Sequence, residues 1–145
     1  MDHSPAEILA ALLKDEGLFT AYDAGASWPV FVSSMPDGGG VEHDCGAVYD
    51  TAGVQEERLL SGENTQRYGY QVKVRALSYN AGWVKITAVA DLFETAHNAV
   101  VTIGDDSYKI ESISQDAPPI ALGLEPGTKR RSLVTLNGLI RLEGE

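Results

Sequence analysis

The sequence predicts an α+β fold with a mostly antiparallel sheet flanked by two helices, and three observations support this. Residues 68–79 alternate apolar and polar side chains with the period of two of a strand buried on one face. Residues 100–113 are typical of a hairpin, and so short a connection joins antiparallel strands. Two segments, near residues 5–15 and 82–98, repeat apolar residues at helical spacing. A parallel crossover through the second helix to the hairpin is an alternative connection.

The chain has the size of a single domain, residues 1–145, which can bury a core without a metal ion or a disulfide. Hydrophobic residues make up 43% and charged residues 22%, as expected for an ordinary globular protein. Its apolar runs are far shorter than the roughly 20 residues that span a bilayer. Residues 1–13 lack the positive start and the long apolar core of a signal peptide, so we expect synthesis in a cytoplasm.

Cys45 is the only cysteine, so the chain can form neither an intrachain disulfide nor a cysteine-rich metal site. Lys and Arg number 11 against 21 Asp and Glu, which gives a net charge of −10. This charge argues against a general nucleic-acid binder, because such proteins need a basic surface to displace counterions from phosphates. Plain solubility explains the acidic balance most simply, and a pore through which DNA slides without sticking would also suit it.

The first helix is predicted over about residues 5–15. Ser4 can cap it, Pro5 suits its first position, Glu7 suits its third, and Gly17 stops it. The apolar stripe that would cover a sheet comprises Ile8, Leu9, Leu12 and Leu13.

Two strands and two loops are predicted between the first helix and the central strand. Residues 28–32 and 45–51 are the β-prone runs. Residues 36–44 form a flexible loop, because consecutive glycines hold no conformation cheaply. These glycines are Gly38, Gly39 and Gly40. Residues 53–66 are polar and charged, which indicates a loop with one helical turn.

The clearest strand pattern covers residues 68–79. One face is predicted to be buried and comprises Tyr68, Tyr70, Val72, Val74 and Ala76. The opposite face comprises Gly69, Gln71, Lys73 and Arg75. Residues 80–82 break the strand, and the second helix follows over about residues 82–98. Its predicted apolar face comprises Val84, Ala88, Val89, Leu92, Phe93 and Ala96.

The last third of the chain is predicted as a hairpin, a loop and a closing strand. Residues 100–113 form the hairpin around a Gly/Asp turn at residues 104–107. Residues 115–128 are rich in proline and glycine, which indicates a long loop. The closing strand covers about residues 131–142, with Gly138 as a bulge.

No motif in the sequence predicts catalysis. His43, Asp44 and Cys45 are adjacent, but neighbours on a strand face opposite ways, whereas catalytic groups usually converge from separated segments. His3, His43 and His97 share no metal-site spacing with each other or with Cys45. We therefore expect no enzymatic activity, no metal ion and no cofactor.

The run Lys129, Arg130 and Arg131 is the one basic cluster of this acidic chain. It could lie on a solvated loop, which needs no function. It could instead pair with an acidic patch, most economically on a neighbouring copy, because Arg favours bidentate contacts with carboxylates. Contact with the phosphates of passing DNA is a third possibility.

The order of these elements resembles the tail terminator (tail completion) and minor capsid family of long-tailed bacteriophages. The similarity covers about residues 5–142 and consists of an ordered set of short patterns. They are Pro5–Leu9, Gln71–Ala76, the helix leading to Asp91–Leu92, Tyr108–Ile110, Ala117–Ile120 with Leu122–Gly123, and Arg130–Arg131 before a strand with Asn137.

This resemblance implies a tail-terminator-like fold in which helices pack on one sheet and a loop orders on assembly. Members of the family form rings of six that cap the tail tube, stop its polymerisation and present a surface to the head connector. The resemblance implies the same partners here: further copies of the chain as a hexamer, the tail tube protein, the head–tail connector protein and DNA in the lumen. It implies a structural protein of the virion, at the head-proximal end of the tail and made in the host cytoplasm.

The expected subunit interface combines these segments. Its residues are Gly38, Gly39, Gly40, Lys73, Arg75, Lys129, Arg130 and Arg131. A connector or neck protein of the head–tail joint is the nearest alternative, since such proteins share this size and composition. A small intracellular enzyme or ligand-binding domain, with His97 and residues 43–45 in its pocket, is the alternative from another class.

Overall fold

The structure, a computed structural model, describes residues 2–22, 27–36, 43–58, 64–125 and 131–143. Its elements in chain order are α1 (Pro5–Asp15), β1 (Val30–Val32), β2 (Cys45–Arg58), β3 (Asn64–Ala76), α2 (Tyr79–Thr95), β4 (Ala99–Ile103), β5 (Asp106–Gln115), β6 (Ile120–Leu124) and β7 (Ser132–Leu142).

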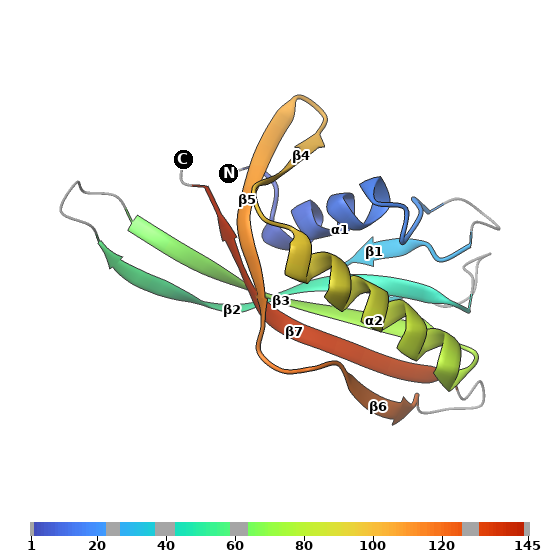
Figure 1. The fold of residues 1–145 in the computed structure, drawn as a ribbon. Coiled ribbons are helices and arrows are strands. Elements are labelled where there is room, and N and C mark those ends of the chain that lie inside the picture. Colours follow the sequence, from blue (N-terminus) through green and yellow to red (C-terminus); the bar gives the residue numbers. More distant parts are fainter. Residues whose placement is uncertain (1, 23–26, 37–42, 59–63, 126–130, 144–145) are drawn as a thin grey trace.

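The strands form one curled sheet in the order β1-β2-β3-β7-β5-β4, with β6 beside β7, and the helices lie against it (Figure 1). Every strand pair except the parallel β1–β2 is antiparallel, so the predicted α+β class is confirmed. Both helices contribute to one core with β3 and β7. Neither described helix is long and apolar enough to span a membrane.

Helix α1 begins and ends where the sequence predicts. Ser4 Oγ accepts a hydrogen bond from the Glu7 N–H at 3.2 Å, and Gly17 follows the helix with a φ of 77°. The Ala6 N–H donates to Asp50 Oδ1 at 2.9 Å, which ties the start of α1 to β2. The predicted apolar stripe, Ile8, Leu9, Leu12 and Leu13, is buried.

Strands β2 and β3 form a long hairpin whose far end extends beyond both helices (Figure 1). Pairing continues beyond Thr51 through Val54–Arg67, Gln55–Gln66 and Arg58–Asn64. The prediction of a loop with a helical turn over residues 53–66 is therefore wrong for the described part of that range. This stretch lacks apolar alternation, and a hairpin that no helix covers needs none, because backbone hydrogen bonds hold it.

Helix α2 begins at Tyr79, about three residues before the predicted start, because Ser78 Oγ caps it by accepting from the Ala81 N–H at 3.1 Å. The predicted apolar face is partly wrong, since Val84 is 60% exposed. The helix approaches the sheet at Gly82, where an added Cβ would lie 3.4 Å from Ala76 and 3.7 Å from Val134. The buried side of α2 is consequently Gly82, Ile86, Val89, Ala90 and Phe93.

Strands β4 and β5 form the predicted hairpin, with Gly104 in the turn at a φ of 60°. The alternative of a parallel crossover is wrong. Strand β4 lies three places from β3 in the sheet, and the intervening antiparallel pairs make the two run in opposite directions.

Residues 115–128 are not a continuous loop, because β6 lies within them and pairs with the start of β7. Strand β7 matches the predicted closing strand. Gly138 is not a bulge, since it pairs regularly with Tyr70 and Gln115. A Cβ at this position would collide with the Ser114 carbonyl oxygen and the Tyr70 hydroxyl, which donates to that oxygen at 3.0 Å. Glycine here therefore leaves room for a hydrogen bond between strands on either side of β7.

Candidate functional site

Arg75 lies on the face of β3 that was predicted to be polar, yet its side chain is only 2% exposed. Its Nε donates to the His43 carbonyl oxygen at 3.1 Å, and its Nη2 donates to the Pro36 carbonyl oxygen at 3.0 Å. Pro36 and His43 flank residues 37–42. Arg75 therefore fixes both ends of the segment that holds the glycine run.

Arg131 is also 2% exposed, and its Nε forms an ion pair with Glu125 Oε1. Its Nη1 lies 3.2 Å from His43 Nδ1, and because guanidinium only donates, Nδ1 is the acceptor. The Glu125 N–H donates to the Arg131 carbonyl oxygen at 2.8 Å. Since Glu125 and Arg131 flank residues 126–130, this pair closes the connection between β6 and β7.

His43 contacts both arginines, so the flanks of two sequence-predicted interface segments meet at one place. The segments themselves lie outside the described residues, namely Gly38, Gly39, Gly40, Lys129 and Arg130. The structure thus brings together the bases of two segments that are about 90 residues apart in sequence, as a single interface requires. Contact with a neighbouring copy stays a prediction.

Lys73 lies two residues before Arg75 on the same face of β3 and is half-buried. Its Nζ is 5.6 Å from the centroid of the Tyr49 ring, at a distance that suits a cation–π contact. A role for Lys73 at a subunit interface stays a prediction.

The adjacent residues His43, Asp44 and Cys45 do not converge. Cys45 is fully buried, and burial raises the pKa of its thiol although Arg75 and Arg131 partly oppose the rise. Asp44 Oδ1 accepts a hydrogen bond from the Leu77 N–H at 2.9 Å, and Leu77 lies two residues before α2 begins. His97 follows the other end of this 17-residue helix, about 25 Å away. The structure therefore separates the residues that the enzyme alternative placed in one pocket.

No group of three His, Cys, Asp or Glu side chains in the described part of the chain is arranged to hold a metal ion.

Large exposed apolar side chains gather on α2 and β6. Nine such side chains occur among the described residues: six belong to α2 or β6, and a seventh, Leu77, lies just before α2. We call these seven the apolar surface: Leu77, Tyr79, Trp83, Val84, Ile120, Leu122 and Leu124. Both elements adjoin Val134 of β7: a Cβ at Gly82 of α2 would lie 3.7 Å from its side chain, and Ala121 of β6 pairs with its backbone.

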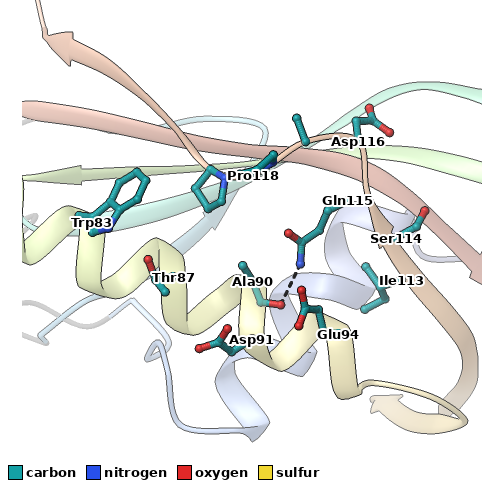
Figure 2. Close-up of a pocket in the computed structure, with 12 residues that line it drawn as sticks. Trp83, Thr87, Ala90, Asp91, Glu94, Ile113, Ser114, Gln115, Asp116 and Pro118 are labelled. Carbon is teal, nitrogen blue, oxygen red and sulfur yellow. Dashed lines mark hydrogen bonds between the residues drawn. The ribbon is translucent and has the colours of Figure 1, made fainter.

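An open groove of about 740 Å³ lies between α2 and residues 113–119 (Figure 2). Trp83 and Pro118 lie at one end, and Ala90 and Ile113 contribute further apolar surface. Gln115 Nε2 donates to the Ala90 carbonyl oxygen at 2.9 Å and so connects the two walls. The carboxylates of the groove are Asp91, Glu94 and Asp116.

No known protein family matches this chain, and no curated protein matches it either. Among solved structures, the chain is similar to one from the "virion of native gene transfer agent (GTA) particle". The TM-score is 0.49 and the identity 12%, over 79% of this chain and 78% of that chain. A similarity of this size supports no assignment of function.

The apolar surface and the groove are not evident from the sequence pattern. One signal was present: residues 120–124 carry no polar side chain, although they follow two prolines in a region predicted as a loop. An uncharged β-prone run of this kind indicates a strand, and only the fold reveals that it stays exposed.

Proposed function

We propose that this chain is a structural protein of a phage-like virion and acts as the tail terminator. Copies of the chain form a ring on the end of the tail tube, stop tube polymerisation and provide the surface that joins the head. The protein works by assembly and catalyses no reaction.

The apolar surface is the observation that carries this proposal. Single exposed apolar side chains are ordinary, but exposed apolar patches mark protein–protein interfaces. Strand β6 is exposed along its whole length and contains no charged or polar residue. In a chain with a net charge of −10, an uncharged surface lets like-charged copies or partners approach closely.

The fold supports the proposal in a second way. Arg75 binds the carbonyl oxygens of Pro36 and His43, and Arg131 contacts His43 and Glu125, so the described residues that flank two predicted interface segments lie at one place. The sequence assigns the glycine run and the basic pair Lys129–Arg130 to these segments. Together with the resemblance to tail terminators, this arrangement favours an assembly role over a catalytic one.

Immunogold labelling of purified particles tests the position. The proposed function predicts one gold cluster per particle, where the tail meets the head, and about six copies of the chain per tail by quantitative mass spectrometry. Gold at the head side of the joint, on heads without tails, would identify a neck protein instead. A chain that is missing from purified particles would contradict the structural role altogether.

A further inference from the structure

We propose that the groove between α2 and residues 113–119 receives the basic pair Lys129–Arg130 of a second copy of this chain. The inference rests on the proposed function, because it takes copies of the chain to assemble with one another. It identifies this groove as the acidic patch of a neighbouring copy with which the basic cluster is expected to pair.

The groove offers unpaired negative charge. Asp91 and Glu94 are exposed on α2, one helical turn apart, and Asp116 lies on the opposite wall (Figure 2). None of these three carboxylates forms an ion pair with another described residue. Two exposed carboxylates one helical turn apart at the edge of a groove are a suitable receptor for a guanidinium or ammonium group.

The apolar part of the groove favours the same occupant. Trp83 is 36% exposed, and its indole lines the groove beside Pro118. A cation is attracted to the face of an indole, and the aliphatic stems of Lys and Arg pack well on proline and tryptophan. The groove is thus matched to a long basic side chain rather than to a bare cation.

The chain contains one run of consecutive basic residues, and one of them, Arg131, forms an ion pair within its own chain. Lys129, Arg130 and Arg131 are the only consecutive basic residues among its 11 Lys and Arg. Arg131 is buried in an ion pair with Glu125 of its own chain. In sequence, Lys129 and Arg130 are the rest of this run, and their positive charge complements the carboxylates of the groove.

This contact joins the groove of one copy to the basic pair of another copy, so the two copies use different surfaces. Such a heterologous interface closes into a ring when the rotation between copies permits it. The docking of a basic pair in an acidic groove would also offset the repulsion between subunits that each carry a net charge of −10.

Charge reversal tests the contact by sedimentation velocity of the full-length chain. Variant one carries Asp91→Lys and Glu94→Lys, and variant two carries Lys129→Glu and Arg130→Glu. Each alone is expected to self-associate at least about tenfold more weakly than the unmodified chain. An equimolar mixture is expected to regain association, because each reversed groove then meets a reversed basic pair.

A matched control reverses two exposed acids outside the groove, Asp15→Lys and Glu16→Lys, and should leave association unchanged. Urea unfolding of every variant checks the fold. As a second readout, acrylamide should quench Trp83 fluorescence less in the assembled protein than in variant one.

Three outcomes would overturn the inference: an unmodified chain that stays monomeric, reversed variants that associate normally, or a mixture that fails to recover. The last would indicate a contact within one chain or with another molecule such as DNA. Gold labelling is an independent test. The groove assignment can fail while the position on the tail is confirmed, and the position can fail while the groove assignment is confirmed.

Discussion

At the scale of single residues, two buried arginines hold the described residues that flank two predicted interface segments. Arg75 binds the carbonyl oxygens of Pro36 and His43, and Arg131 pairs with Glu125. A buried ion pair of this kind contributes little net stability when complete, but removing one partner leaves an uncompensated charge.

Arg131→Met is therefore expected to lower the free energy of unfolding by about 3 kcal/mol, because the mostly buried Glu125 carboxylate would lose its partner. Urea denaturation measures the change. The double variant Arg131→Met with Glu125→Met should recover most of the loss. Equal destabilisation by the single and double variants would show that the ion pair is not the cause.

This burial also decides which charge reversal is informative about assembly. Arg131→Glu would place two carboxylates in one buried site and unfold the region, so a loss of assembly would say nothing about an interface. Lys129 and Arg130 are the residues at which to reverse the charge.

Cys45 predicts a specific dependence of stability on pH. Its pKa is raised in the folded state, mainly by burial, so the folded chain holds the thiol proton more tightly than the unfolded chain. The stabilising contribution is fully present below the unfolded pKa of about 8.5 and is lost as the pH rises towards the folded value.

The free energy of unfolding should thus fall between pH 8 and pH 10 more steeply for the unmodified chain than for Cys45→Ala. Urea unfolding across this range gives both slopes, and the comparison cancels the other titrating groups. Parallel slopes, or rapid labelling of the native thiol by a disulfide reagent, would contradict the burial of Cys45.

Residue-level features were the hardest to predict from the sequence. Three consecutive basic residues look alike in sequence, and nothing in that pattern indicates that Arg131 is buried in an ion pair with Glu125. Gly138 is required by a hydrogen bond between Tyr70 and Ser114, a contact between strands that no local pattern encodes. Arg75 has the alternation of a polar face, but its side chain is buried and binds the carbonyl oxygens of Pro36 and His43, which are distant in sequence.

At the scale of elements, β6 connects the fold to the proposed function. Its three large side chains are each about half exposed, at 48% for Ile120, 50% for Leu122 and 53% for Leu124. The fold alone does not require apolar residues at such positions.

Leu122→Ser with Leu124→Ser should therefore leave the free energy of unfolding within roughly 1 kcal/mol of the original, since surface substitutions cost little. The same variant should lose its place in the particle, measured as copies of the chain per purified virion. The matched control is Val100→Ser, at a 64% exposed position of β4. Normal incorporation of the β6 variant would show that β6 is not an interface.

Elements with strong local signals were predicted well. The caps and apolar stripe of α1, the alternation in β3 and the extent of β7 all match the structure. The far end of the β2–β3 hairpin, β6 and the buried face of α2 did not follow from the sequence. Backbone pairing holds the first two without apolar alternation, and the orientation of α2 is set by its close approach at Gly82.

At the scale of the whole molecule, a strongly acidic net charge is combined with exposed apolar side chains. The chain carries ten more acidic than basic residues, yet the start of α2 and all of β6 expose apolar side chains. Such a molecule repels its copies in general and can associate through selected faces only. That property suits a subunit that must add to one end of a tube and stop there.

Electron microscopy of particles assembled without this chain tests the central proposal most directly. A terminator predicts abnormally long tails that are detached from filled heads, because nothing stops the tube or joins it to the head. Tails of normal length beside heads that leak or fail to join would indicate a neck protein and contradict the terminator. A particle population identical to that assembled with the chain would contradict a structural role of any kind.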